Sequence, residues 1–315
     1  MAASVAASMA KRAERQIERR RVVGAAAAAA AAASPRQRAG RRRPTKAERS
    51  DPFHLYESSV QRPEDDVAFF AETFRRLRGR AAKILREDFC GTAKLSLAWC
   101  KSAPGRRAVG VDLDEATLAW ARRRNLTPYT RSLRGRLKLV HGDVLEVRDT
   151  RADVICAMNF SFCVFKERAQ LARYLAAARD GLADDGLLFL ELYGGTGAME
   201  PVEEDRELNG FTYIWEQKRF DPITHETLCY IHFKFPDGSR LDRAFTYDWR
   251  LWTIPELRDL LLEAGYSKVR VFWATVDEDD TAGSSDDMIY GDGDYVELDA
   301  VDQQYSWLVY VVGEK

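Results

Sequence analysis

The hydrophobic and polar positions of this chain form a repeating alternation of helix-like and strand-like segments. After Asp51, Val67, Phe70, Phe74 and Leu77 recur at the spacing of one helical face, which predicts an amphipathic helix. Short apolar runs follow at regular intervals, separated by helix-like stretches. The runs expected to form buried strands are AKIL (82–85), AVGV (108–111), LKLV (137–140), DVICAMN (153–159) and GLLFLEL (186–192).

Strands that alternate with helices at this interval predict a parallel sheet, because parallel neighbours need crossover connections and these are right-handed. The predicted fold class is therefore α/β, with a doubly wound and mostly parallel sheet. Near the C-terminus, TIPELRDLLLEAGYSKVRVFW predicts a further helix and strand, with Thr253 and Glu256 as a capping box. The run SWLVYVV predicts the last strand.

The alternation breaks after Tyr193. Residues 211–252 contain three strand-like segments, FTYIWEQKRF, ETLCYIHFKF and RAFTYDWRLW, and predict an antiparallel meander. We expect residues 194–252 to form a small antiparallel β insertion that acts as a lid. Residues 277–304 hold 11 acids and no Lys or Arg, so we expect a solvated acidic loop there.

Charge divides the chain at about residue 50. Residues 1–50 contain 13 Lys or Arg against 3 Asp or Glu, whereas the remainder contains 35 against 46. Because this Ala/Arg-rich segment has few large apolar side chains, we expect residues 1–50 to be a disordered basic tail and residues 51–315 to be the folded domain. The tail has features of an organelle transit peptide, of a nucleic-acid or import patch and of a solvated arm, and these alternatives stay open.

Composition restricts the compartment and the cofactor chemistry. No apolar run approaches the roughly 18 residues needed to span a bilayer, so we expect a soluble protein without a membrane partner. Five dispersed cysteines indicate buried free thiols in a reducing compartment, which is the cytoplasm, or a chloroplast or mitochondrion if the tail is a transit peptide. Four scattered histidines give no metal-ligand spacing, so no metal is expected.

Candidate chemistry begins where the first strand ends, in KILREDFCGTAKLSLAW (83–99). Ligands of open parallel sheets collect at the carboxyl ends of the strands. Glu87 follows the strand, and Gly91 allows a tight turn because it has no β-carbon. The segment lacks G-x-G-x-x-G and G-x-x-x-x-G-K-[ST], which argues against NAD and ATP. A carboxylate at this position repels pyrophosphate and attracts a cationic amino group.

Acidic residues also follow the second and third strands. Asp112 ends the strand in AVGVDLD and suits two ribose hydroxyls, and Asp143 of HGDVLEV suits an adenine amino group. Each acid taken alone is equally typical of a helix N-cap. Together with Glu87, they predict a site for a nucleoside that carries a positive amino group and no phosphate.

Five segments in order, ILREDFCGTA, VGVDLDEATLAWA, HGDVLEV, DVICAMNFSF and DDGLLFLELYGG, resemble the successive motifs of class I S-adenosylmethionine-dependent methyltransferases. The resemblance covers about residues 55–313. It implies a Rossmann-like, seven-stranded sheet, a methyltransferase domain and S-adenosyl-L-methionine as cofactor. Phe89 and Ala93 stand where the family has glycines. The cofactor-binding residues it implies are Glu87, Phe89, Cys90, Gly91, Asp112, Leu113, Asp143, Val144 and Asn159.

The methyl acceptor is expected beyond the fourth and fifth strands. There Asn159 is a candidate for orienting a nucleophilic nitrogen, and Tyr193 for contacting the methionine carboxylate or the acceptor. Glu57 is a candidate general base, because an amine must lose its proton before it attacks. A turn role for Asn159 and a surface linker around Glu57 are equally compatible with the pattern.

The insertion supplies candidate acceptor-binding side chains. We expect Tyr56, Trp215, Trp249 and Arg250 to contact the acceptor, with Arg250 binding a carboxylate or phosphate. Packing of the aromatic side chains on the sheet is the alternative explanation.

The resemblance to small-molecule N-methyltransferases favours a small acceptor methylated at nitrogen. The alternatives are a methyltransferase acting on nucleic acid or protein, which the basic tail suggests, and a non-catalytic cofactor-binding protein. The acidic body without a basic stripe makes nucleic acid the less favoured partner.

Overall fold

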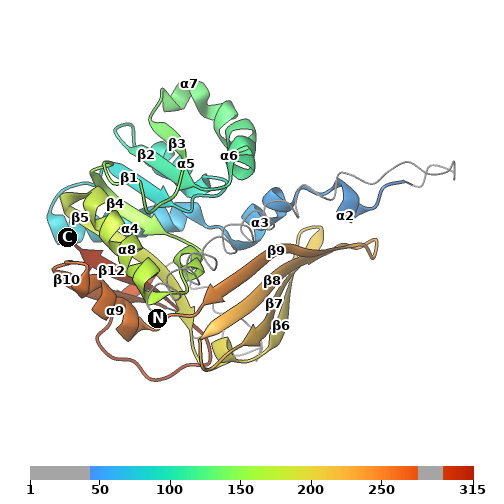
Figure 1. Ribbon diagram of the computed structural model, residues 1–315. Coiled ribbons are helices and arrows are strands. Elements are labelled where there is room, and N and C mark those ends of the chain that lie inside the picture. Colours follow the sequence, from blue (N-terminus) through green and yellow to red (C-terminus); the bar gives the residue numbers. More distant parts are fainter. Residues whose placement is uncertain (1–42, 276–293) are drawn as a thin grey trace, which may run out of the picture.

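The computed structural model describes residues 43–275 and 294–315, which build one large and one small sheet (Figure 1). The large sheet has eight strands in the order β11-β10-β12-β5-β4-β1-β2-β3. Strands β1 to β5 pair with one another in parallel, whereas β10, β11 and β12 are antiparallel to their neighbours. The strands are β1 (Ile84–Asp88), β2 (Arg107–Asp112), β3 (Leu137–His141), β4 (Ala152–Ala157), β5 (Leu182–Gly194), β10 (Lys268–Ala274), β11 (Tyr295–Glu297) and β12 (Trp307–Glu314).

This order confirms the doubly wound α/β class, because the chain reverses direction across the sheet between β1 and β4. The number of strands differs from the expected seven, because β11 pairs with β10 and adds an eighth. This strand lies within the stretch expected to be an acidic loop, of which 277–293 fall outside the described residues. Tyr295 anchors β11, since its ring lies 4.7 Å from both Phe69 and Tyr310.

Helices cover the large sheet where the apolar spacing predicts them. The first core helix is α4, and it buries Val67, Phe70 and Phe74 on one face. The capping box of Thr253 and Glu256 is present at the start of α9. The helices are α2 (Lys46–Arg49), α3 (Pro52–Val60), α4 (Pro63–Arg78), α5 (Lys94–Ser102), α6 (Glu115–Ala121), α7 (Thr130–Leu133), α8 (Arg168–Gly181) and α9 (Ile254–Glu263), with short helical turns η1 (Arg122–Leu126), η2 (Thr127–Tyr129), η3 (Ser161–Val164) and η4 (Gly197–Met199).

The second sheet lies beside the large one and below α3 in Figure 1. Its four strands are β6 (Val202–Leu208), β7 (Phe211–Phe220), β8 (Glu226–Lys234) and β9 (Arg240–Arg250), all antiparallel. The predicted meander corresponds to β7, β8 and β9. The segment VEEDREL also forms a strand, β6, although its mostly charged side chains carry no apolar alternation.

Residues 43–50, the last part of the predicted tail, are described by the structure and include the short helix α2. Thr45 and Glu48 form a capping box at α2. The amide of Lys46 donates to Asp237 Oδ2 at 2.8 Å, and the amide of Ala47 donates to Ser239 Oγ at 3.1 Å. The first amides of a helix lack partners within the helix, so the turn between β8 and β9 supplies them. The rest of the tail lies outside the described residues.

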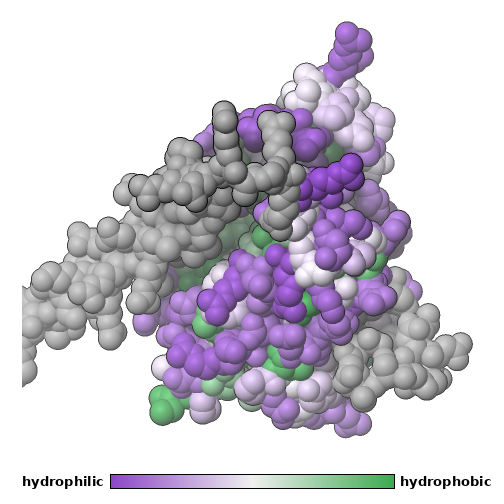
Figure 2. Space-filling view, turned by 90° about the vertical axis from the view of Figure 1, so that its right-hand side faces the viewer, coloured by the Kyte–Doolittle hydropathy of each residue, from purple (hydrophilic) through white to green (hydrophobic). Residues whose placement is uncertain are grey.

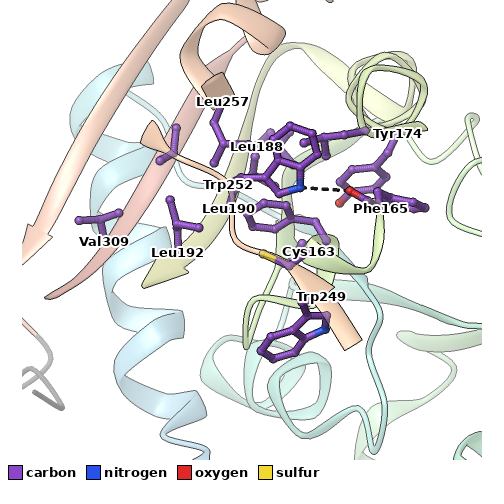
Figure 3. Close-up of a cluster of buried hydrophobic side chains, with 14 of the residues drawn as sticks. Cys163, Phe165, Tyr174, Leu188, Leu190, Leu192, Trp249, Trp252, Leu257 and Val309 are labelled. Atoms are coloured by element: carbon purple, nitrogen blue, oxygen red, sulfur yellow. Dashed lines mark hydrogen bonds between the residues drawn. The ribbon is translucent and has the colours of Figure 1, made fainter. Parts of the chain in front are cut away.

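Trp252 connects the two sheets. It lies two residues after the end of β9 and is almost fully buried in the core cluster shown in Figure 3, near Cys163, Leu190 and Leu257. Its indole Nε1 donates to the carbonyl oxygen of Phe165 at 3.1 Å. This contact fixes the point at which the insertion returns to the large sheet.

Polar side chains are the most frequent among the described residues on the face shown in Figure 2. On the face shown in Figure 2, apolar side chains occur only in small separate areas among the described residues. None of the helices in the described part of the chain is long and apolar enough to cross a membrane. All five cysteines are buried and unbonded, as the sequence predicts.

A buried ion pair sits beneath the carboxyl end of β1. The guanidinium of Arg86 contacts both oxygens of Asp88, at 2.7 and 3.1 Å, and neither side chain is exposed. Arg86 also donates to the carbonyls of Val144, at 3.1 Å, and of Val147. The hydroxyl of Tyr174 on α8 donates to Asp88 Oδ2 at 3.0 Å. One network therefore joins β1, the loop after β3 and α8.

Removing the charge of Asp88 should destabilise the protein strongly. In Asp88→Asn the Arg86 guanidinium stays buried without a counter-ion, so we expect the free energy of unfolding to fall by about 3–5 kcal/mol. Urea denaturation followed by tryptophan fluorescence measures this change.

Asp180→Asn is the matched control, because it breaks an ion pair with Arg148 whose two side chains are about half exposed. Its cost should stay below about 1 kcal/mol. Equal losses in the two variants would show that the buried pair contributes no more than a surface pair.

Candidate functional site

A cavity of about 150 Å³ opens at the carboxyl ends of β1, β4 and β5. The large sheet contributes Glu87, Met158 and Asn159 to its lining. The linker between α3 and α4 and the inner face of β7, β8 and β9 close it from the other sides. The predicted insertion therefore covers the switch point of the parallel sheet, where ligands bind in such folds.

The turn that leaves β1 has an unusual backbone. Phe89, Gly91 and Ala93 have positive φ angles of 57°, 51° and 57°. A Cβ on Gly91 would meet no atom within 4 Å, so no neighbouring group in the protein excludes a side chain there. Glycine is favoured at this position because it adopts the left-handed conformation without strain. Phe89 and Ala93 take the same conformation with side chains, which costs about 1–2 kcal/mol each.

The side chains of Phe89 and Cys90 are directed into the protein and do not line the cavity. The Phe89 ring lies 5.9 Å from that of Phe165 and 5.7 Å from that of Tyr174. Cys90 is buried so close to β2 that a Cβ on Gly110 would lie 2.9 Å from its sulfur. These two predicted cofactor-binding residues therefore offer the site their backbone.

Asp112 locks this turn at the end of β2. Its Oδ2 accepts from the amide of Gly91 at 2.8 Å, and its Oδ1 accepts from the amide of Asp114 at 2.9 Å. Burial raises the pKa of Asp112, and these two hydrogen bonds oppose the rise. The N-cap of α6 is Asp114, so the capping alternative does not apply to Asp112.

The loops after β2 and β3 carry the other implied adenine contacts. Leu113 is 51% exposed, whereas Val144 is buried. Asp143 Oδ1 accepts from the amide of Leu145 at 3.0 Å, as in an Asx turn. Asp112, Leu113, Asp143 and Val144 lie next to one another at the β2 and β3 end of the sheet edge, outside the lining of the cavity.

Glu87 belongs to β1 itself, one residue before its end, and not to the turn that follows. Its side chain is buried, and its Oε2 accepts from the amide and the hydroxyl of Ser96 at 2.9 and 2.6 Å. Burial raises the pKa of Glu87 to about 8, against the effect of the Ser96 hydrogen bonds. It lines the cavity, so β1 directs Glu87 toward α5 and directs Arg86 and Asp88 toward α8.

Asp65, Asp66 and Glu191 also line the cavity, and the sequence pattern did not single them out. Glu191 of β5 accepts a hydrogen bond from the amide of Asn159, and burial raises its pKa to about 8. Asp66 of α4 accepts from the hydroxyl of Tyr310 at 2.7 Å, and burial raises its pKa to about 6. The available signal was the lone acid inside GLLFLEL, since a charged residue is expensive in a buried strand.

Aromatic rings form the opposite wall. The Tyr247 ring lies 5.9 Å from that of Trp215 and 4.4 Å from that of Trp249, and all three line the cavity. Tyr56 lines it from α3 and packs at 5.0 Å on Phe245. The predicted residues Tyr56, Trp215 and Trp249 thus meet at one cavity.

Arg250 is not part of this wall. Successive side chains of a strand point to opposite faces, so β9 directs Trp249 into the cavity and Arg250 away from it. Its Nη2 donates to Glu256 Oε1 at 2.8 Å, and its guanidinium lies 3.8 Å from the centre of the Trp252 ring. This arrangement does not support the predicted contact between Arg250 and an anionic acceptor.

The three candidate catalytic residues lie in different surroundings. Asn159 and Tyr193 line the cavity, whereas Glu57 lies outside its lining. Glu57 is buried, with its Oε1 2.6 Å from Asn125 Nδ2 and its Oε2 3.2 Å from Lys94 Nζ. Through these contacts Glu57 connects α3 to Lys94 of α5 and to Asn125, and its side chain does not reach the cavity.

The hydroxyl of Tyr193 is buried without a hydrogen bond among the described residues. Thr227 and Cys229 are its nearest polar neighbours, and burial raises the pKa of Tyr193 well above its usual value. The hydroxyl therefore stays protonated at neutral pH and offers a donor.

Glu191 should make stability depend on pH. Because its folded pKa of about 8 exceeds the ordinary value of 4.5, the unfolded chain loses this proton first, and stability falls as pH rises between these values. Glu191→Gln keeps an acceptor oxygen for Asn159 and removes the titration. We expect the melting temperature of the variant, relative to that of the wild type, to increase as the pH is raised from 5 to 8.

The groups facing Glu191 do not produce this difference. Tyr295 and Tyr310 have raised pKa values and stay neutral throughout this range, and Asp66 titrates in both proteins. A melting-temperature difference between variant and wild type that is constant from pH 5 to pH 8 would contradict the assignment.

Comparison with known proteins identifies the class of this fold. Residues 89–186 match the family model described as a methyltransferase domain. The sequence matches no curated protein.

Several solved structures resemble most of the chain. The CcbJ methyltransferase of Streptomyces caelestis has 16% identity and a TM-score of 0.60, with 82% of this chain and 98% of that chain covered. The sugar N-methyltransferase KedS8 of a Streptoalloteichus species has 18% identity, a TM-score of 0.56, and 90% and 98% covered. CalS10, an amino pentose methyltransferase of Micromonospora echinaspora, has 17% identity, a TM-score of 0.57, and 84% and 96% covered.

These similarities confirm the Rossmann-like methyltransferase fold that the sequence motifs imply. At identities of 16–18%, the solved structures show that the fold is shared, and they do not identify the methyl acceptor of this chain.

Proposed function

We propose that this protein transfers a methyl group from S-adenosyl-L-methionine to a nitrogen atom of a small molecule. The main support is the left-handed turn of residues 89–93, fastened to Asp112 beside an enclosed cavity. The turn offers backbone without the repeated glycines of a phosphate cradle, as a nucleoside without phosphates requires.

The residues at the sheet edge fit this cofactor. Asp112 and Asp143 lie at neighbouring strand ends for the ribose and the adenine, and Glu87 provides a carboxyl group for a cationic amino group. When bound, the cofactor supplies a methyl group on a positively charged sulfur that is transferred by direct displacement. The protein's own contribution is to position the acceptor and exclude water.

The shape of the cavity favours a small acceptor over a polymer. Its walls come from both sheets and from the α3–α4 linker, so the acceptor end is enclosed. Asn159 and Tyr193 lie at the ends of β4 and β5, where they contact the acceptor in this proposal. Nitrogen as the methylated atom is consistent with KedS8, described as a sugar N-methyltransferase, and with CalS10, described as acting on an amino pentose.

Asp112→Ala should weaken cofactor binding at least tenfold, because it removes the ribose acceptor and releases the Gly91 amide. Calorimetric titration with S-adenosyl-L-methionine measures this. Asp184→Ala is the control, since that side chain is 91% exposed on the far end of β5. Unchanged affinity in Asp112→Ala with an intact circular-dichroism spectrum would refute the assigned cofactor site.

Transfer of a labelled methyl group to fractionated cell extract distinguishes the possible acceptors. We expect label in the small-molecule fraction. Label in nucleic acid or protein would favour the polymer alternative, and cofactor binding without any transfer would favour a non-catalytic protein.

A further inference from the structure

The lining of the cavity is strongly acidic. Asp65, Asp66, Glu87 and Glu191 line it, and Arg62 is the one basic side chain among the described lining residues. Glu87 is engaged by Ser96. The pair formed by Asp66 and Glu191 has neutral hydrogen-bond partners, the Tyr310 hydroxyl and a backbone amide. Among the described residues neither forms a direct ion pair, and the one basic charge that acts on Asp66, that of Arg62, only partly opposes the rise in its pKa.

Buried carboxylates without counter-ions are costly, so they retain protons or bind a cation. Burial is the main cause of the raised pKa values of Asp66 and Glu191. The charge of Asp66 raises the pKa of Glu191 further, and Asp65 and Glu64 raise that of Asp66. A positively charged ligand would supply the missing counter-charge.

An unpartnered polar atom points to the same kind of ligand. The amide oxygen of Gln61, a residue that lines the cavity, is buried and has no hydrogen-bond partner among the described residues. An amide oxygen can only accept, so Gln61 requires a donor such as an N–H group. Unsatisfied buried groups of this kind usually mark a missing ligand or water.

The aromatic wall adds a third feature. Tyr213, Trp215, Tyr247 and Trp249 face the carboxyl pair across the cavity from the second sheet. The faces of Trp and Tyr rings attract cations, most strongly where water is excluded. A neutral ligand could only form hydrogen bonds with the carboxyl groups, an anionic ligand would be repelled once they ionise, and Arg250, which could bind an anion, lies outside the cavity.

We propose that the acceptor enters this cavity as a compact ammonium cation, bound between the aromatic wall and the Asp66–Glu191 pair. The amide oxygen of Gln61 accepts a hydrogen bond from one of the N–H groups of this cation. This rests on the proposed function. An ammonium nitrogen has no lone pair, so one N–H proton passes to a carboxylate of the pair first. The freed lone pair would then form the bond to the methyl carbon, while the bond between methyl and sulfur breaks and leaves its electron pair on the sulfur. Glu191 thus replaces Glu57 as the candidate base.

Three ligands of similar shape and different charge test the proposal directly. They are cyclohexylamine, which is protonated at pH 7.5, the neutral cyclohexanol and the anionic cyclohexanecarboxylate. Calorimetric titration of the full chain, saturated with S-adenosylhomocysteine, should show at least tenfold tighter binding of the amine than of either analogue. Equal affinities, or preference for the alcohol or the carboxylate, would overturn the proposal.

Glu191→Gln should abolish most of the preference for the amine over the alcohol, because glutamine keeps the shape of the side chain but cannot release a proton and become the counter-charge when a cation binds. Glu216→Gln is the matched control. It lies next to Trp215 on the opposite face of β7, paired with Lys218 and His232, and should leave the preference unchanged. A preference that survives in Glu191→Gln, or falls equally in both variants, would contradict the role of the pair.

Trp249→Leu provides a test independent of the carboxyl groups. It should weaken binding of the amine severalfold and change binding of the alcohol much less, since a leucine side chain still packs but has no ring face. Equal weakening of both ligands would assign Trp249 to packing and would count against the aromatic wall.

These binding measurements need no methyl transfer. A protein that prefers the amine but transfers no methyl group to any acceptor would refute the proposed function and leave the cation site standing. A protein that transfers methyl groups but binds the three ligands equally would refute the cation site and leave the proposed function standing.

Discussion

The buried pair of Arg86 and Asp88 is the interaction on which the rest of the site depends. Its guanidinium holds the carbonyls of Val144 and Val147, and its carboxylate holds Tyr174 of α8. A buried charge pair is stable only when the remaining donors and acceptors are satisfied, and here the backbone of the loop after β3 satisfies them. The loop that bears Asp143 and the turn that begins at Phe89 are thereby fixed relative to each other.

The turn after β1 illustrates how packing offsets local strain. Phe89 and Ala93 hold left-handed conformations that glycine adopts freely. Phe89 gains contact with the rings of Phe165 and Tyr174, and the latter is also a member of the Arg86–Asp88 network. The loss of two glycines is therefore compensated by burial, and the backbone keeps the path that leads the Gly91 amide to Asp112.

The second sheet turns an open strand edge into an enclosed cavity. Its strand alternation places Trp215, Ile231 and Trp249 inward, and places Glu216 and His232 together on the outer face. The large sheet supplies carboxyl groups and the small sheet supplies rings. Neither sheet alone surrounds a ligand, and Trp252 fixes the junction between them.

The sequence alone determined the parallel sheet, the antiparallel insertion and the acids at the strand ends, because hydrophobic period and strand-end chemistry are local properties. Only the tertiary structure decided which side chains share the cavity. Arg250 and Trp249 are neighbours in sequence yet face opposite ways, and Glu57 is drawn away by Lys94 and Asn125. Asp66 and Glu191 come together from α4 and β5 across a long separation in sequence, and no local pattern encodes such a meeting.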